Sequence, residues 1–586
     1  MCGIAGLTME PGAPPPGSAV LSALSEALQH RGPEGTGHSV VGRTALVHTR
    51  LAIIDLAGGD QPLFAGPAAL VGNAEVYNYR ELTAGLPSTS FATGSDCEPP
   101  LHLWRRDGSA YAGALRGMFA LAIHDRAAHS LTLTRDPFGI KPLYTAQIPS
   151  GLAFASEPQA LLAAGLVRRG LRPGARDELL QMQFTTGADT IFPGIQRVLP
   201  GETLRAVDGH IVDRQRVPAL PEGGPEDIDE GIAVARLDRA LEQSVDFHQR
   251  SDVPYGMFLS GGIDSAAILA MMARLNAGGV LAFTAGFDVP GAADERAHAA
   301  VVARAAGARH ETIEVTEAMV WRHLPQIVAA MDDPAADYAI IPSWFLARRA
   351  KQDVKVVLCG EGGDELFAGY GRYRTAMRPW WGGGRVMRAR GTFDKLDVLR
   401  TVPTGWRDGI AAAEARASGG GRTRLALAQA TDVADWLPHD LLLKLDRCLM
   451  AHAVEGRTPL LDPGVAAAAF RLPDGLKVRG GRGKYLLRRW LADHLPAANP
   501  FAPKQGFTVP IAAWIAGQGA RLGPLVAAQP GVAEIAAPDK VVSLFRHADG
   551  RHEGFAAWTL LFYALWHRAH IEARPVDGDV FEVLGS

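Results

Sequence analysis

The strongest constraint on the fold is a glycine-rich loop between an apolar strand and a helix. Residues 254–259 have the apolar run of a short buried strand, residues 260–265 read SGGIDS, and residues 265–275 have helical periodicity. The backbone N–H groups of such a loop converge with the N-terminus of the helix, and this arrangement binds phosphate groups. The loop therefore predicts a phosphate site at the end of a strand, with a plain tight turn as the alternative interpretation.

Two further strands follow the same plan. Residues 280–287 and 354–358 are short apolar runs, and strands that alternate with helices predict a parallel, helix-covered sheet with ligands at the carboxyl ends of its strands. The loop at 359–370, CGEGGDELFAGY, directly follows the last of these strands, so both loops are expected on one edge of the sheet. Its carboxylates are suited to share a metal with phosphate oxygens, although an acidic surface turn has the same composition.

The chain is too long for a single hydrophobic core. Its 586 residues predict at least two domains, which we place at 1–210 and 226–586. The first two hundred residues read as short strands with a few helices, one of them N-capped by Ser18. The stretch 207–229 is polar and rich in proline and glycine, which predicts a linker. The stretch 379–422 is expected to be a loop-rich insertion, and no chemistry is assigned to it.

Composition favours small-molecule partners in a reducing compartment. The formal net charge of -3 creates no field that would gather nucleic acid or an anionic membrane. No apolar run reaches the roughly 18 to 20 residues that a membrane span needs. The cysteines form no CxxC pair and are too few for a disulfide framework; they are Cys2, Cys97, Cys359 and Cys448. A cytoplasmic protein that binds neither nucleic acid nor membrane is therefore expected.

The second residue of the chain is a candidate nucleophile. If Met1 is removed, Cys2 carries both a thiol and a free α-amine. An α-amine titrates at about 8 and a thiol at about 8.5, so this amine can take up the thiol proton near neutral pH. The alternative interpretation is a cysteine that merely follows the start codon.

Six motifs, the first of which contains Cys2, give this N-terminal cysteine a context. They are residues 1–6 (MCGIAG), 30–35 (HRGPEG), 48–55 (HTRLAIID), 73–78 (NAEVYN), 93–96 (TGSD) and 135–144 (RDPFGIKPLY). Together they resemble the class II glutamine amidotransferases across the whole first domain. The resemblance implies an α+β N-terminal-nucleophile sandwich with αββα layers and glutamine as substrate.

The same resemblance implies a role for particular residues. Cys2 would be the nucleophile, while the amide of Asn73 and the backbone N–H of Ala74 would stabilise the oxyanion. Arg50 would hold the glutamine carboxylate with its planar fork, and two acids would hold the ammonium. The glutamine-binding set is Arg50, Leu51, Ile54, Asn73, Glu75 and Asp96. Ala74 stands where the family usually has glycine, which keeps the donor but restricts its backbone.

The second half of the chain has its own resemblance. The SGGIDS loop is similar to that of the ATP pyrophosphatases, which cleave ATP between the α and β phosphates. It is joined by the loop at 359–370, 332–334 (DDP), 446–447 (DR), 457–462 (RTPLLD), 483–484 (GK) and 504–507 (KQGF). This set resembles the synthetase domain of bacterial asparagine synthetases. It implies an α/β domain with a doubly wound parallel sheet of the ATP-pyrophosphatase type.

This second resemblance implies an ATP site with Mg²⁺. The nucleotide-binding set is Leu259, Ser260, Gly261, Gly262, Asp264, Ser265, Ala285, Cys359 and Gly360. Asp264 and Asp364 would bind the metal, and Glu361 and Lys484 would serve the reacting centre. Lys484 would neutralise charge as pyrophosphate leaves, although a solvated surface lysine is the alternative. Cys359 stands where the family usually has serine, which weakens its hydrogen bonding.

The expected function is glutamine-dependent asparagine synthesis. Glutamine would be hydrolysed at Cys2, the side-chain carboxylate of aspartate would be adenylated, and ammonia would displace AMP. The motifs leave open the same chemistry on another carboxylate, such as that of a natural product, a peptide or an envelope sugar. They also leave open a non-catalytic storage or regulatory relative, a homodimer, and the geometry of ammonia passage between the sites.

Overall fold

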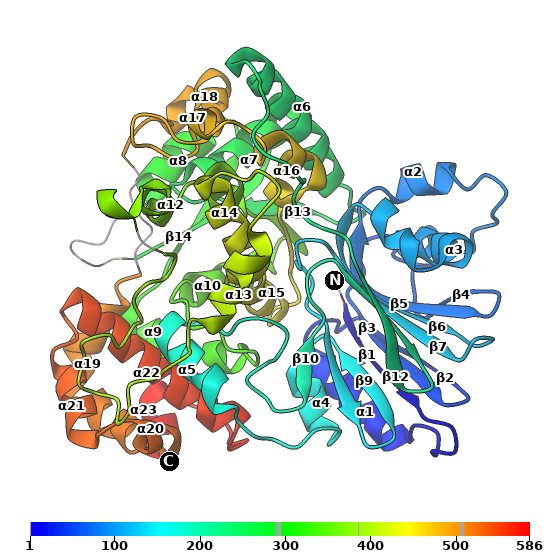
Figure 1. The fold of residues 1–586 in the computed structure, drawn as a ribbon, viewed down its shortest axis with the longest axis horizontal. Coiled ribbons are helices and arrows are strands. Elements are labelled where there is room, and N and C mark those ends of the chain that lie inside the picture. The colour runs from blue at the N-terminus through cyan, green and yellow to red at the C-terminus, as the bar shows by residue number, and fades with distance from the viewer. Residues whose placement is uncertain (1, 288, 290–294, 385, 504–508) are drawn as a thin grey trace.

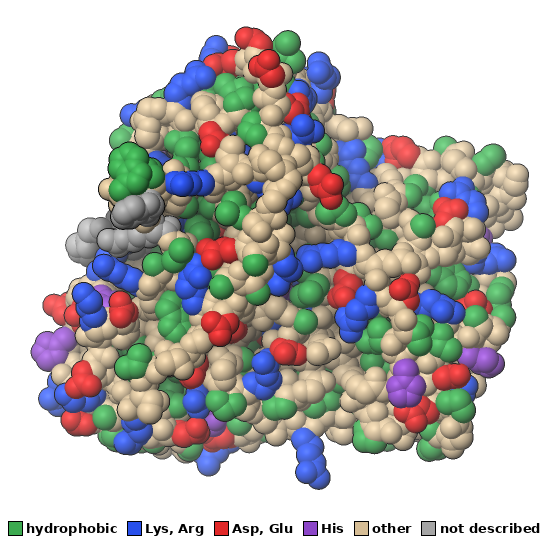
Figure 2. Space-filling view, in the orientation of Figure 1, with side chains coloured by type: hydrophobic (Ala, Val, Ile, Leu, Met, Phe, Trp, Pro, Cys, Tyr) green, Lys and Arg blue, Asp and Glu red, His purple; other side chains and the backbone are tan. Residues whose placement is uncertain are grey.

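A computed structural model describes residues 2–287, 289, 295–384, 386–503 and 509–586. Figure 1 shows antiparallel strands gathered in the N-terminal unit and a helix-rich unit packed beside them. On the face drawn in Figure 2, Lys and Arg are intermixed with Asp and Glu, in agreement with the small net charge. Among the residues described, none of the helices combines the length and apolar character that a bilayer crossing needs.

Two six-stranded antiparallel sheets form the N-terminal unit, in the orders β10-β8-β9-β1-β3-β2 and β12-β11-β7-β6-β5-β4. The first contains β1 (Gly3–Met9), β2 (Gly35–Val41), β3 (Thr44–Arg50), β8 (Tyr144–Ile148), β9 (Gly151–Ala155) and β10 (Ile195–Arg197). The second contains β4 (Leu63–Ala65), β5 (Ala68–Val76), β6 (Gly117–Asp125), β7 (Ser130–Arg135), β11 (Glu202–Val207) and β12 (His210–Arg216). The helices are α1 (Ser18–Leu28), α2 (Tyr79–Ala84), α3 (Glu98–Asp107), η1 (Gly108–Ala114), α4 (Pro158–Ala163) and α5 (Pro173–Met182).

Alternation along the strands builds four layers. In β1, Ile4 enters the core between the sheets, whereas its neighbour Ala5 packs in the core beneath α1 and α4. In β6, Ala120 faces the core between the sheets and Leu121 faces the one that includes residues of α3. Both sheets are therefore covered by helices on their outer faces. These layers confirm the predicted αββα sandwich.

The second unit is built on a five-stranded sheet of order β15-β14-β13-β16-β17, parallel throughout. Its strands are β13 (Tyr255–Phe258), β14 (Leu281–Gly286), β15 (Arg309–Glu314), β16 (Val356–Leu358) and β17 (Glu455–Arg457). Val356 and Leu358 pack in the core that contains α6, α7 and α8, whereas Val357 packs with α9, α10 and α15. Helices cover both faces, which confirms the doubly wound sheet. The strands predicted at 254–259, 280–287 and 354–358 are β13, β14 and β16.

The helices of this unit up to residue 382 are α6 (Glu230–His248), α7 (Ile263–Leu275), α8 (Arg296–Ala305), α9 (Glu317–Ala329), α10 (Ile340–Ala350), α11 (Gly363–Phe367), α12 (Gly371–Met377) and η2 (Trp380–Gly382). They are followed by α13 (Asp408–Ala417), α14 (Arg424–Thr431), η3 (Asp432–Leu441), α15 (Leu442–Met450), η4 (Pro459–Leu461), α16 (Pro463–Ala469), α17 (Asp474–Lys477), α18 (Tyr485–His494) and η5 (Pro496–Ala498). The C-terminal group, red and orange in Figure 1, is α19 (Ile511–Ala527), α20 (Pro530–Ile535), α21 (Pro538–Arg546), α22 (Arg551–His570) and α23 (Val580–Gly585).

Three local predictions differ from the structure. The stretch 207–229 is not linker throughout, because β12 pairs with β11 and extends the second sheet. It reads as polar because this edge strand is largely exposed to solvent. Ser18 is the first residue of α1 rather than its N-cap, which is Gly17. The stretch 379–422 contains the helix α13 as well as loops.

Candidate active sites

The candidate nucleophile lies at the start of β1. Cys2 is buried, with 8% of its surface exposed, and its backbone N–H donates to Asn73 Oδ1 at 3.2 Å. Burial raises the pKa of the Cys2 thiol, while a hydrogen bond with the Leu51 backbone lowers it. The nitrogen that becomes the α-amine on removal of Met1 is therefore held beside the thiol by Asn73.

Two hydrogen-bond donors suited to an oxyanion lie on β5. Asn73 is fully buried, and its Nδ2 has no hydrogen-bond partner among the described residues. The backbone N–H groups of residues 72 and 76 point to the side of β5 away from β6, where side-chain oxygens accept them at 2.6 and 2.8 Å. Because backbone donors alternate along a strand, the N–H of Ala74 points to that same side. A tetrahedral oxyanion near Cys2 would satisfy both groups.

The charged side chains predicted to bind glutamine include Arg50 and Asp96, and their surroundings differ. Arg50 donates to the carbonyl of Asp55 at 2.6 Å and to Asp60 Oδ1 at 2.8 Å. The Asp60 side chain is 80% exposed, so a substrate carboxylate can displace it at little cost. Asp96 accepts the N–H of Val76, and burial raises the pKa of this carboxyl to about 6.

The Glu75 carboxylate reaches across to the second unit. Its Oε2 lies 2.8 Å from Nη2 of Arg457 on β17, and Arg457 also donates to Glu455 at 2.6 Å. All three side chains are buried. Glu75, predicted to meet the glutamine ammonium, is thus also half of an ion pair between the units.

The second site is a cavity of about 340 Å³ at the carboxyl ends of β13, β14 and β16. Most of the predicted nucleotide-binding set lines it: Leu259, Ser260, Asp264, Ser265, Ala285, Cys359 and Gly360. Gly261 and Gly262 line a neighbouring pocket of about 480 Å³ that shares Ser260, Asp264, Glu295 and Asp364 with the cavity. The loop at 260–265 therefore lies between two adjoining pockets, one suited to a nucleotide and the other to its phosphates.

The loop at the end of β13 presents its backbone N–H groups as the sequence predicts. The N–H of Ser260 donates to Ser265 Oγ at 3.1 Å, and that of Gly261 donates to Glu295 Oε2 at 2.9 Å. The Glu295 carboxylate therefore occupies a position that suits a phosphate oxygen. Helix α7 begins directly after this loop and adds the positive end of its dipole.

Asp264, Asp364 and Lys484 meet at the mouth of the phosphate pocket. Lys484 Nζ lies 2.8 Å from Asp364 Oδ1 and forms an ion pair with Asp264 as well. Lys484 is buried and holds a left-handed backbone (φ 60°) at the start of α18, where its N–H donates to the Phe367 carbonyl. Two carboxylates that converge on one cation fit a magnesium ion, because hard oxygen ligands suit that metal. Among the described residues, no cluster of three or more His, Cys, Asp or Glu side chains makes a metal cage.

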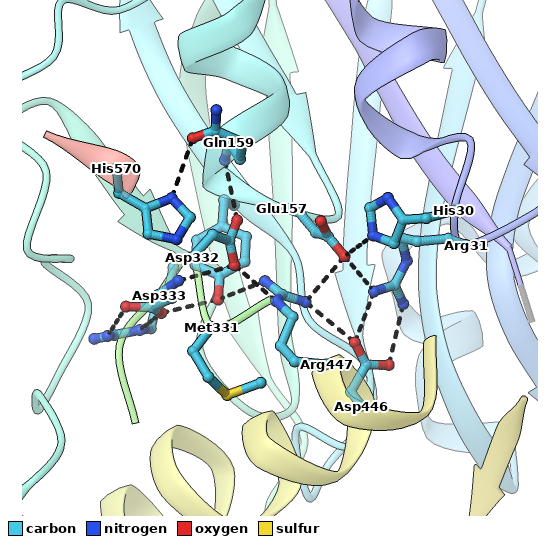
Figure 3. A network of polar contacts seen from close by, with 12 residues as sticks. His30, Arg31, Glu157, Gln159, Met331, Asp332, Asp333, Asp446, Arg447 and His570 are labelled. Carbon is cyan, nitrogen blue, oxygen red and sulfur yellow. Dashed lines mark hydrogen bonds and ion pairs between the residues drawn. The ribbon is translucent and has the colours of Figure 1, made fainter. Parts of the chain in front are cut away.

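A buried network of charges joins the two units (Figure 3). Arg31 donates to Glu157 at 2.6 Å and to both oxygens of Asp446 at 2.8 and 3.0 Å. Arg447 donates to Asp446 at 3.1 Å and to Asp332 at 2.7 Å. Burial raises the pKa of Asp446, but Arg31, Lys141 and Arg447 together lower it below its ordinary value. The network thus keeps the buried Asp446 carboxylate ionised.

The structure brings Cys2 and Asn73 into contact and places most of the predicted nucleotide-binding set around one cavity. Sequence reasoning did not find Glu295 or Lys444, which line the cavity, and it gave Arg457 no role although its motif at 457–462 was singled out. Lys444 had a usable signal, because a lysine between two leucines in an apolar helix requires a partner. The predicted motif at 504–507 lies outside the described residues.

Comparison with known proteins agrees with this architecture. Residues 1–216 match the family model of the glutamine amidotransferase domain, and residues 236–568 match that of asparagine synthase. The glutamine-hydrolysing asparagine synthetase 1 of Bacillus subtilis is 31% identical, over 95% of this chain and 94% of that protein.

Two other relatives show how far the sequence similarity extends. A Mycobacterium bovis protein, provisionally named a glutamine-hydrolysing asparagine synthetase, is 35% identical over 98% of both chains. Amidase chyE of Penicillium rubens is 30% identical over 64% of this chain and 60% of its own length. By its two matched domains and these full-length relatives, the chain belongs to the glutamine-hydrolysing asparagine synthetase family, enzymes that join a glutaminase domain to an ATP-using synthetase domain.

Proposed function

We propose that this enzyme makes asparagine from aspartate, glutamine and ATP. The observation that carries the proposal is the convergence of Asp264, Asp364 and Lys484 beside a phosphate-binding loop and a nucleotide-sized cavity. That arrangement suits cleavage of ATP between the α and β phosphates. The names of the full-length relatives support aspartate as acceptor.

In the first reaction, the Cys2 thiolate attacks the side-chain amide of glutamine. The α-amine freed by removal of Met1 takes up the thiol proton, and Asn73 Nδ2 with the Ala74 N–H stabilises the oxyanion. Ammonia leaves, and water hydrolyses the thioester to glutamate. Arg50 holds the glutamine carboxylate, Glu75 and Asp96 hold its ammonium, and Leu51 and Ile54 line the site. The unpartnered Asn73 Nδ2 supports this assignment.

In the second reaction, the β-carboxylate of aspartate attacks the α-phosphorus of ATP. Pyrophosphate leaves towards Lys484, which neutralises its charge, and ammonia then displaces AMP from the acyl carbon. Glu361 lies beside the reacting acid. Mg²⁺ bound by Asp264 and Asp364 would supply charge neutralisation for the phosphates when present.

We also propose domain bounds, a cellular location and a state of assembly. We take 1–210 and 226–586 as the two catalytic domains, and four free cysteines support a reducing, cytoplasmic location. Assembly as a homodimer is tested by the mass of the protein in solution. Light scattering that gives the mass of one chain excludes it.

An acceptor panel tests the proposed function. Purified enzyme receives ATP, Mg²⁺ and glutamine with aspartate or with other carboxylic acids, and AMP is measured. Aspartate-dependent AMP with one asparagine per AMP supports the proposal, whereas AMP formation only with another acid refutes aspartate as acceptor. Asp264→Ala should abolish AMP formation with glutamine or ammonium salts while glutamine hydrolysis survives. A wild-type protein that neither hydrolyses glutamine nor exchanges pyrophosphate into ATP would favour a non-catalytic relative.

A further inference from the structure

Residues outside the predicted nucleotide-binding set also line the nucleotide cavity. Besides the predicted nucleotide residues, Glu361, Glu365, Tyr370, Leu441 and Lys444 line it. Among the described residues that line this cavity, Lys444 is the one cation. The acids that line it are Asp264, Glu295, Glu361, Asp364 and Glu365. A molecule that brings further negative charge into this cavity therefore meets a single positive partner among its described lining residues.

Lys444 is held in place as a charged group. It lies on α15 with 6% of its surface exposed, and its Nζ is 2.7 Å from Asp337 Oδ2. The other oxygen of Asp337 accepts the N–H of Ala339, which fixes the carboxylate just before α10. Burial lowers the pKa of Lys444, but Asp337 and Asp440 outweigh burial and raise it. The ammonium is thus preorganised at the cavity wall.

Lys484, the lysine of the phosphate pocket, has a different role. Lys484 pairs with Asp264 and Asp364 at the phosphate pocket, and it does not line the 340 Å³ cavity. An acceptor with two carboxylates presents one to the α-phosphate. A second carboxylate that enters this cavity lies among acids, where an unpaired charge is costly. Of the described lining residues, only Lys444 can neutralise it.

We propose that Lys444 binds the second carboxylate of the acceptor and so selects aspartate over acids that lack this group. The acids that line the cavity match the ammonium of aspartate, and Lys444 matches its α-carboxylate. This inference rests on the proposed function, because it specifies what selects aspartate. It makes Lys444 a binding residue for the α-carboxylate.

Removal of one carboxylate from the substrate tests the proposal directly. The probe pair is aspartate and 3-aminopropanoate, which is aspartate without its α-carboxylate, and the readout is acceptor-dependent exchange of pyrophosphate into ATP. Loss of one partner from a desolvated charge pair is expected to lower kcat/KM by about 30-fold or more. Wild type should therefore prefer aspartate by at least that factor. Equal use of the two acids by wild type would overturn the proposal without any variant.

The variant Lys444→Met locates the effect. It should lower kcat/KM for aspartate by about 30-fold, chiefly through KM, and leave 3-aminopropanoate within about 3-fold, so that discrimination collapses. The variant Lys444→Arg keeps the positive charge and should retain part of the discrimination between aspartate and 3-aminopropanoate. The matched control is Lys477→Met, since Lys477 is also a buried lysine of this domain but does not line the cavity. Discrimination that survives in a folded, glutamine-hydrolysing Lys444→Met protein would contradict the proposal.

Failure of this inference differs from failure of the proposed function. If aspartate supports exchange but Lys444→Met leaves discrimination intact, only the inference fails. If no exchange depends on aspartate, the proposed function fails. The acid found in the panel is then compared with its analogue that lacks the second carboxylate, and equal use of the two refutes the role of Lys444.

Discussion

Arg31 donates a hydrogen bond of 3.2 Å from Nε to the carbonyl oxygen of Cys2. Its two Nη groups bind both oxygens of Asp446, which lies on α15 in the synthetase domain. One fully buried side chain therefore contacts the backbone of the candidate nucleophile and the neighbouring domain. Helix α15 also carries Lys444 to the nucleotide cavity, so this helix lines one site and is linked to the other through Arg31.

The charge on Asp446 should matter to stability. Asp446→Asn leaves Arg31 buried with half of its charge compensation gone, which is expected to cost about 3 to 5 kcal/mol. Urea-induced unfolding measures this loss. Glu242→Gln is the control, because Glu242 pairs with Arg274 on the surface at 3.0 Å and should cost less than about 1 kcal/mol. Equal losses of unfolding free energy in the two variants would show that the buried network stabilises the protein no more than a surface ion pair does.

The thiol should be required for glutamine use alone. Cys2→Ala is expected to abolish ammonia release from glutamine while asparagine synthesis from ammonium salts continues, because the adenylation site is separate. Glutamate release and AMP formation are measured side by side. The intact mass of the wild-type protein should lack one methionine. A mature enzyme that retains Met1 would remove the proposed base.

Asn73 Nδ2, which has no hydrogen-bond partner among the described residues, should act in the transition state. Asn73→Ala is expected to lower kcat for glutamine hydrolysis by about 10²- to 10³-fold, the usual effect of losing one oxyanion donor. Steady-state kinetics separate this fall from a change in KM. Ala74→Gly keeps the backbone donor and should stay within a few-fold of wild type. If Asn73→Ala raised only KM, Asn73 would bind glutamine without stabilising the oxyanion.

Glutamine hydrolysis should weaken in acid because of Asp96. Its pKa of about 6 lies above the ordinary range, so the carboxylate is ionised above pH 6 and neutral below it. Only the ionised form pairs with the glutamine ammonium, so kcat/KM should fall about tenfold per pH unit below 6. In Asp96→Asn this acid limb should disappear and KM should be high at every pH. An unchanged limb would assign the titration to another group.

The local fold around the glycine-rich loop was predictable from sequence. A strand, a glycine loop and a helix at 254–275 need only short-range pattern, and the structure gives β13 and α7 there. The edge strand β12 was missed because its exposed polar residues resemble a linker. Where neither burial nor periodicity marks a strand, pairing with a neighbour decides it.

Contacts between the domains could not be predicted from sequence. Arg31 and Asp446 are 415 positions apart, and Glu75 meets Arg457 across a similar separation. Each of these charges reads as an ordinary polar residue until a partner from a distant segment buries it. Long-range pairing depends on how the two domains dock, which local pattern does not encode.

The central claim is that aspartate is activated by attack on the α-phosphorus of ATP, and one isotope measurement tests it. The enzyme is supplied with glutamine, ATP and aspartate carrying ¹⁸O in its β-carboxylate, and the phosphorus products are analysed by mass. The account predicts AMP that carries one ¹⁸O atom from aspartate and pyrophosphate that carries none. ADP with ¹⁸O-labelled inorganic phosphate would contradict it.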